Sequence, residues 1–179
     1  MKQRACKTLA HSTAGAHLQW VRPKKHTNRG TSLNRCQPRS WAWQKKNTCA
    51  FRDTTFQGIC RAAASDQTVI GIPVLKIKEE DQLLFQQQQI SKAAAAKQVI
   101  LFDHAGAGYA KTSAQQLDFM NLFYQKTGIP TDIVYTGKLM QAVLQLAEKN
   151  YFTAADHIVV LHTGGLQGNN SVADGRLLF

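Results

Sequence analysis

Three short motifs in the second half of the chain carry side chains that could do chemistry. Gly-Tyr-Ala-Lys contains Tyr109, Tyr-Thr-Gly-Lys begins at Tyr135, and His-Thr-Gly-Gly-Leu-Gln-Gly contains Thr163. A tyrosine can stack on a flat ring or transfer a proton. A threonine followed by two glycines lets backbone N–H groups approach an anionic ligand closely. The motif around Thr163 therefore has a physical reason to border a flat, anionic cofactor.

Each motif also has an ordinary structural interpretation. Tyr135 could be a core tyrosine with a bonded hydroxyl. Thr136 could be the N-cap of a helix, and Lys138, in the first turn of that helix, would then be a solvated lysine. The glycines after Thr163 could form a plain turn. Taken singly, the motifs do not define a function.

The elements expected around these motifs alternate between strand and helix. Apolar faces predict helices over residues 54–64, 113–125 and 136–148, and an acidic start predicts another over 79–95. Short apolar runs predict strands over 68–74, which is rich in β-branched residues, 99–102 and 158–161. The short connections imply an α/β fold, a parallel sheet with helical crossovers. The last strand would run directly into Thr163, and ligands bind at the carboxyl ends of strands in such sheets.

Together the motifs resemble the C-terminal portion of the pyridoxal-phosphate-dependent D-cysteine desulfhydrase and 1-aminocyclopropane-1-carboxylate deaminase family. The motifs recur in the family's order, and residues 72–76, 111–112 and 128–130 are also similar to it. The resemblance covers about residues 54–168. It implies a partial tryptophan-synthase-β-like architecture (fold type II), a small amino-acid substrate and, as in most relatives, a homodimer.

The resemblance also implies a role for each site residue. Tyr135 would lie against the pyridine ring, Thr163 would hydrogen-bond to the ring nitrogen, and Tyr109 would be an acid or base beside the substrate. Thr136 would support the ring, and Thr54 remains from the loop that binds the cofactor phosphate. The expected catalytic residues are Tyr109 and Tyr135, and the expected cofactor-binding residues are Thr54, Tyr135, Thr136, Thr163 and Gly164. No metal site is expected.

Two positions separate the reactions of this family. Ring-opening deaminases carry glutamate where this chain has Thr136 and leucine where it has Thr163. The resemblance is therefore closer to D-cysteine desulfhydrase, which eliminates hydrogen sulfide and releases pyruvate and ammonia. 1-Aminocyclopropane-1-carboxylate deamination is the alternative.

The first part of the chain differs from the rest. Residues 1–50 hold half of the 22 Lys and Arg residues and none of the 11 Asp and Glu residues, so the formal charge of +11 lies there. We therefore expect a basic segment over 1–52, disordered or not in the native reading frame, an incomplete α/β domain over 53–168, and a poorly ordered tail over 169–179.

Two features of the family are not found in this sequence. The lysine that forms the Schiff base with the cofactor has no counterpart, and the glycine-rich phosphate loop is replaced by residues 49–55, where Asp53 would repel phosphate. We therefore interpret the chain as a truncated or frameshifted family member that is inactive alone.

The basic segment leaves other functions open. It could bind a polyanion or serve as a targeting segment, although it has no recognisable nucleic-acid-binding motif. The four cysteines lack the spacing of a zinc site or a disulfide framework, and no apolar run is long enough to span a membrane. These features predict a cytoplasmic protein. We expect no binding to membranes, and binding to nucleic acid is the less favoured alternative.

Overall fold

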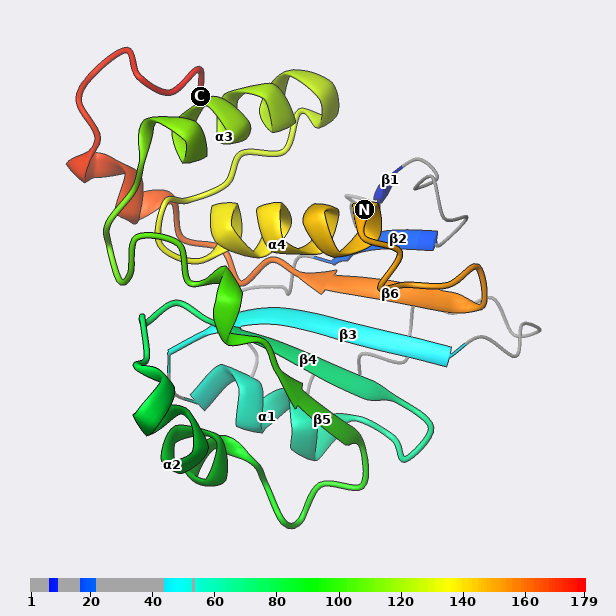
Figure 1. The fold of residues 1–179 in the computed structure, drawn as a ribbon. Helices are drawn as coiled ribbons and strands as arrows, with labels where there is room; N and C mark the ends of the chain where they lie inside the picture. Colours follow the sequence, from blue (N-terminus) through cyan, green and yellow to red (C-terminus); the bar gives the residue numbers. More distant parts are fainter. Residues whose placement is uncertain (1–6, 10–16, 22–43, 53) are drawn as a thin grey trace, which may run out of the picture.

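A six-stranded sheet runs through the middle of the structure (Figure 1). The computed structural model describes residues 7–9, 17–21, 44–52 and 54–179. The strands are β1 (Lys7–Leu9), β2 (His17–Val21), β3 (Gln44–Phe51), β4 (Thr68–Pro73), β5 (Lys97–Ile100) and β6 (Asp156–Leu161), in the spatial order β1-β2-β6-β3-β4-β5. β1 is antiparallel to β2, and the other neighbouring pairs are parallel. The predicted parallel sheet with helical crossovers is confirmed.

Helices cover both faces of this sheet. They are α1 (Thr54–Ala62), α2 (Glu79–Gln89), α3 (Ala114–Thr127) and α4 (Thr136–Glu148), with short 3-10 turns η2 (Phe102–His104) and η3 (Leu166–Ser171). α4 lies on one face with α3 beyond it, and α1 lies on the other face with α2 (Figure 1). The sequence placed all four helices.

The alternation of side chains along β3 and β4 divides the core into two layers. Ala50 and Ile70 face α4, in a cluster that includes Leu139 and Val143. Their neighbours on the strands face α1, in a second cluster formed by Cys49, Phe51, Phe56, Ile59, Cys60 and Val69. Both faces of the strands are therefore buried, as expected for parallel strands with helices on each side. Cys60 is a buried thiol, as predicted.

α2 is shorter than the sequence predicted. It ends at Gln89, and Ile90 is already extended. The backbone N–H of Ser91 donates to the side-chain oxygen of Gln98, and the side-chain amide of Gln98 donates back to the carbonyl of Ser91, both at 2.8 Å. Because these bonds take the backbone groups that another helical turn would need, the helix stops there.

The amino-terminal part contains structure that the sequence analysis did not expect. β3 occupies the centre of the sheet and pairs with both β4 and β6, and the short strands β1 and β2 extend the sheet beyond β6. The expectation of a disordered segment over 1–52 is therefore wrong for residues 7–9, 17–21 and 44–51. Apart from Arg52, the remainder of that segment lies outside the described residues, and the proposed change of reading frame stays a prediction.

The tail was also expected to be poorly ordered, and this expectation is wrong. The side-chain amide of Asn121 on α3 donates to the carbonyl of Arg176 at 2.9 Å, and its oxygen accepts from the N–H of Leu178 at 3.0 Å. The ring of Phe179 packs on Tyr124, with centroids 4.7 Å apart. These contacts fix the last residues against α3.

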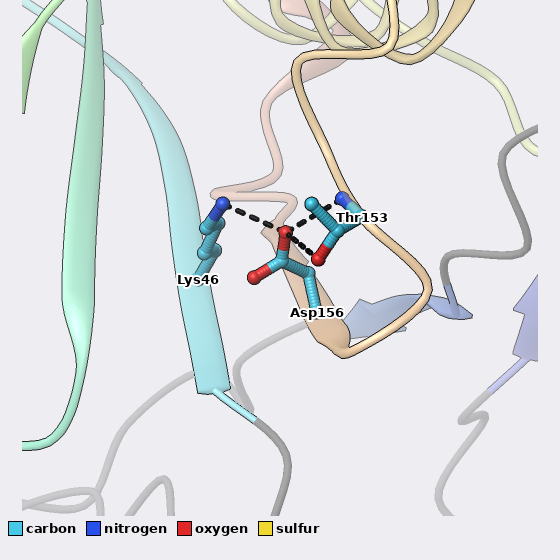
Figure 2. Close-up of polar contacts among 3 residues, drawn as sticks. All are labelled: Lys46, Thr153 and Asp156. Carbon is cyan, nitrogen blue, oxygen red and sulfur yellow. Dashed lines mark hydrogen bonds and ion pairs between the residues drawn. The ribbon is translucent and has the colours of Figure 1, made fainter.

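A partly buried ion pair joins the amino ends of β3 and β6 (Figure 2). The Lys46 ammonium lies 2.7 Å from the Asp156 carboxylate, which is almost fully buried. The backbone N–H and the hydroxyl of Thr153 donate to the same carboxylate oxygen. All three donors converge on one acid, so this end of the sheet is closed by matched polar groups.

Candidate ligand-binding cleft

A cleft of about 450 Å³ opens at the carboxyl ends of β3 and β6. Four segments line it: the connection from β3 to α1, the loop that bears Tyr109, the turn before α4 and the loop after β6. The lining residues are Ala50, Arg52, Thr54, Thr55, Tyr109, Asp132, Val134, Tyr135, Thr163, Gly164, Gly165, Gln167 and Gly168. This is the edge at which parallel sheets bind ligands.

The cleft brings together most of the predicted site residues. Tyr109, Tyr135, Thr54, Thr163 and Gly164 all line it, although they come from four separate segments of the chain. The expected roles of these residues stay predictions.

Thr136 is the predicted site residue that does not line the cleft. It is only 1% exposed, and its hydroxyl donates to the Asp132 carboxylate at 2.7 Å. It is also the first residue of α4 and not its N-cap, a position that Tyr135 occupies without a side-chain capping bond. The predicted N-cap is therefore wrong by one residue.

Asp132 is the residue that organises the start of α4. Its carboxylate accepts hydrogen bonds from the backbone N–H groups of Val134, Tyr135 and Thr136, all between 2.8 and 2.9 Å, besides the Thr136 hydroxyl. An acid at this place also suits the positive end of the helix dipole. Asp132 thereby fixes the backbone that aims Tyr135 into the cleft. The sequence analysis did not identify it.

The two tyrosines of the cleft touch each other. The ring centroids of Tyr109 and Tyr135 are 6.3 Å apart with an angle of 78° between the planes, an edge-to-face contact. The guanidinium of Arg52 lies over the Tyr109 ring, 5.4 Å from its centroid. Burial, followed by the hydrogen bond to Tyr109, raises the pKa of Tyr135 to about 12. The Tyr135 phenol is therefore protonated at neutral pH.

Buried polar contacts hold the loop after β6. His162 is 1% exposed; its Nδ1 accepts from the N–H of Gly164 at 3.0 Å, so its Nε2 carries the hydrogen and donates to the carbonyl of Pro130 at 3.1 Å. Gly164 has a φ of +84°, a conformation that favours glycine. The imidazole thus ties the backbone beside Thr163 to the segment before α4.

A second bridge comes from η3. The Asn169 side chain accepts from the N–H of Ile133 at 3.0 Å and donates to the carbonyl of Thr131 at 3.0 Å. On the other side, the side-chain amide of Gln116 on α3 donates to the carbonyl of Ile133 at 2.9 Å. Asn169 thus joins the segment before Tyr135 to η3, which follows Thr163, and Gln116 joins that segment to α3. The sequence analysis identified neither side chain.

Lys138 departs most from its expected environment. The prediction of a solvated lysine is wrong, because the side chain is 2% exposed and its Nζ donates to the carbonyl of Gly108. Arg52 and Gln167 were also not identified as cleft residues. Arg52 follows a strand that was not predicted, so no sequence signal placed it at this edge.

Within the described ranges, no three His, Cys, Asp or Glu side chains gather where they could hold a metal ion. Over the same residues, no helix combines the length and apolar character that crossing a membrane requires.

Comparisons with known proteins identify relatives of this chain. A 1-aminocyclopropane-1-carboxylate deaminase of Mesorhizobium japonicum is 34% identical over 80 residues, 45% of this chain and 24% of the relative. A Pyrococcus furiosus protein, provisionally named as the same deaminase, is 32% identical over 129 residues, 72% of this chain and 32% of the relative. No family model matches the sequence.

A solved structure has a similar fold. The crystal structure of a 1-aminocyclopropane-1-carboxylate deaminase homologue matches 69% of this chain with a TM-score of 0.55, at 20% sequence identity and over 40% of its own length. This likeness confirms the fold class, an α/β architecture of the fold type II kind.

The fold is thus that of an α/β protein with a cleft at the carboxyl edge of a parallel sheet. The chain is similar to part of proteins named 1-aminocyclopropane-1-carboxylate deaminase, so the resemblance seen in its motifs is confirmed. It spans a quarter to a third of the length of these two curated relatives.

Proposed function

We propose that this chain forms the cofactor-facing part of a pyridoxal-phosphate-dependent lyase whose parent reaction is the elimination of hydrogen sulfide from D-cysteine. The observation that supports this best is the shared cleft, in which Tyr109, Tyr135 and Thr163 meet from three separate segments. The names of the relatives support the family, and threonine at positions 136 and 163 supports desulfhydration over ring opening.

The lining residues fit the ring and the phosphate of the cofactor. Thr163 supplies a hydroxyl and Tyr135 an aromatic face, while Arg52 brings a positive charge beside the hydroxyls of Thr54 and Thr55. A guanidinium can bind phosphate through paired hydrogen bonds, which compensates for the glycine-rich loop that this chain lacks. When bound, the cofactor supplies an electron sink for a carbanion on the substrate.

The lining residues do not fit a covalent attachment. Among the described residues that line the cleft, none is a lysine. Lys138 is a residue of α4, and its amine donates a hydrogen bond to the carbonyl of Gly108, the residue before Tyr109. We therefore infer that the chain alone binds the cofactor without a covalent bond and does not turn over D-cysteine.

The two phenols have different roles in this proposal. Burial and the hydrogen bond to Tyr109 raise the pKa of Tyr135, so we assign to its phenol the covering of the ring and the donation of a hydrogen bond. Tyr109 is 40% exposed and can exchange its proton with solvent, so we assign proton transfer at the substrate to its hydroxyl. Thr163 is a neutral donor, which leaves the ring nitrogen largely unprotonated and suits elimination of a good leaving group such as a thiolate.

Ring-opening deamination is the second candidate, because the relatives are named for it. A complete enzyme that contains this cleft would distinguish the two reactions: D-cysteine releases hydrogen sulfide, whereas the sulfur-free deaminase substrate cannot. Homodimer formation and a cytoplasmic location stay predictions from the sequence.

Binding of pyridoxal phosphate to the purified chain tests the proposal. Equilibrium dialysis against the cofactor should show saturable binding, and Thr163→Val and Tyr135→Phe should each weaken it about tenfold, the effect of one hydrogen bond or ring contact of about 1.4 kcal/mol. Tyr151→Phe is the matched control, because Tyr151 is as exposed as Tyr109 but does not line the cleft.

Borohydride treatment separates the two parts of the proposal. We expect no cofactor to remain attached after reduction and denaturation. A label on a specific lysine, together with sulfide release, would overturn the inactive, non-covalent assignment. Binding that none of the cleft variants weakens would overturn the site itself.

A further inference from the structure

The loop that carries Tyr109 has an unusual backbone. Residues 105–113 join η2 to α3, and three of them have positive φ: Gly106 at +63°, Gly108 at +102° and Ala110 at +53°. A left-handed alanine is sterically unfavourable. The loop's own hydrogen bonds, from Gly108 N–H to Ala105 and from Lys111 N–H to Gly108, are both 3.3 Å, which is long for backbone bonds. The loop therefore depends on contacts from outside it.

Lys138 supplies such a contact from α4. Its side chain is buried, and its Nζ donates to the carbonyl of Gly108, the residue before Tyr109. Its Cε lies 3.7 Å from the position that a Cβ would take on Gly106. One side chain of α4 thus reaches both glycines of the loop.

Burying this amine is unfavourable in itself. Desolvation lowers the pKa of Lys138, and the negative charge of Asp132 only partly opposes that effect. A methionine would fill a similar volume without the loss of hydration. What the lysine adds, compared with an apolar residue, is the hydrogen bond to the loop.

We propose that Lys138 is a positioning residue that holds the Tyr109 loop against α4, so that the Tyr109 ring stays at the edge of Tyr135. Tyr135 is the N-cap of α4 and Lys138 lies three residues further on, so one helix carries both sides of the contact. The relevance of this geometry to chemistry rests on the proposed function, in which the two phenols line one ligand site.

Proton NMR of the ligand-free chain tests the inference. The native chain should show nuclear Overhauser contacts between the ring protons of Tyr109 and Tyr135, assigned with single Tyr→Phe variants. Lys138→Met should reduce these contacts at least threefold while the helical circular dichroism persists. Lys149→Met is the matched control, because this lysine caps the other end of α4, is exposed and should change nothing.

A phenol titration by rapid pH jump gives a second readout. Tyr135 faces Tyr109, Arg52 and Asp132, and its titration near pH 12 includes the hydrogen bond to Tyr109. Lys138→Met should lower its midpoint by about half a pH unit or more, because that bond is lost and water gains access. Lys138→Arg keeps an N–H donor on a long stem and should retain most of the native behaviour.

Hydrogen exchange of the native chain covers the case in which Lys138→Met does not fold. The amides of Gly108 and Lys111 should exchange at least tenfold more slowly than in an unstructured peptide. Exchange at the unstructured rate, or a folded Lys138→Met variant with native ring contacts and titration, would overturn the inference. No cofactor is present in these measurements, so a negative result would not contradict the proposed function. Equally, a failure to bind the cofactor would not contradict the positioning role of Lys138.

Discussion

Lys46 and Lys138 lie at different ends of the sheet, and their hydrogen-bond partners differ. At the amino ends of the strands, Lys46 is bonded to the Asp156 carboxylate at 2.7 Å (Figure 2). Beside the cleft, Lys138 is more deeply buried, yet its amine is bonded to the carbonyl of Gly108. A charge paired with an opposite charge recovers much of its lost hydration, and one paired with a carbonyl recovers less.

The difference separates a closed end of the sheet from an open one. The amino end has matched charges, whereas the carboxyl end has a cleft of about 450 Å³ and, beside it, the buried Thr131 hydroxyl with no hydrogen-bond partner. Substitutions at the amino end should therefore change stability alone. Substitutions at the cleft should change stability and ligand binding together.

The largest change in stability is expected at Asp132, which both lines the cleft and accepts the hydrogen bonds at the start of α4. Asp132→Ala leaves three backbone N–H groups and the Thr136 hydroxyl without their acceptor. We expect a loss of about 3–5 kcal/mol in the free energy of unfolding, since each buried unsatisfied donor costs about 1–3 kcal/mol. Urea unfolding measures it. Asp118→Ala, on an exposed position of α3, should stay within about 0.5 kcal/mol. A loss below about 1 kcal/mol for Asp132→Ala would contradict the capping role.

The amino-end pair is the next test. Asp156→Leu should cost about 2–4 kcal/mol, because it leaves the Lys46 ammonium without its carboxylate. Adding Lys46→Met should recover part of that loss, with a coupling of about 1–3 kcal/mol between the two sites. Pyridoxal phosphate affinity should be unchanged in any of these variants that fold. A change in affinity would break the separation between the two ends.

Acid unfolding sharpens the same comparison. Burial raises the pKa of Asp156, but the hydrogen bonds and charge of Lys46, together with Thr153, outweigh it, so the pKa lies below the ordinary value. A depressed pKa in the folded state means that the carboxylate stabilises the protein above the unfolded-state pKa of about 3.9. That contribution is lost as the pH falls through the folded-state pKa. Asp156→Asn should therefore lose less stability than the native chain between pH 6 and pH 3. Parallel acid limbs would contradict this.

The two ends also differ in how much of them the sequence revealed. Thr163 and Tyr135 could be expected to lie close together. Thr163 follows the apolar strand β6, Tyr135 precedes the apolar helix α4, and the carboxyl ends of parallel strands lie at one edge of the sheet. β3 could not be expected, because its polar residues hide its strand pattern. Lys46 pairs with Asp156, 110 residues away, and Asn47 donates to Gln67 at 3.0 Å. Partners this distant leave no local signal.

The residues missed at the cleft have a similar explanation. Asp132 caps α4 from four residues before its first helical residue, through a turn that local helix-start patterns do not describe. Lys138 is charged, and a lysine in a first helical turn is solvated unless another segment covers it. The covering segment here is the loop around Gly108, 30 residues earlier in the chain. Tertiary contacts therefore decided both positions.

The smallest changes in stability are expected at three glycines that all have room for a Cβ but differ in backbone conformation. A Cβ on Gly58, Gly164 or Gly175 would meet nothing within 4 Å. Gly58 lies within α1, so Gly58→Ala should stabilise the chain by about 0.5–1 kcal/mol. Gly164 and Gly175 have φ of +84° and +77°, so alanine at either position should destabilise it by about 1–2 kcal/mol.

The pair with positive φ isolates the ligand site from backbone strain. Gly164 lines the cleft beside Thr163, whereas Gly175 lies in the tail packed on α3. Both alanine variants should lower the urea midpoint by similar amounts, but only Gly164→Ala should weaken pyridoxal phosphate binding, because the strain displaces the backbone next to the Thr163 hydroxyl. If Gly175→Ala weakened pyridoxal phosphate binding equally, affinity would follow overall stability. That result would contradict a ligand site at the carboxyl ends of the strands.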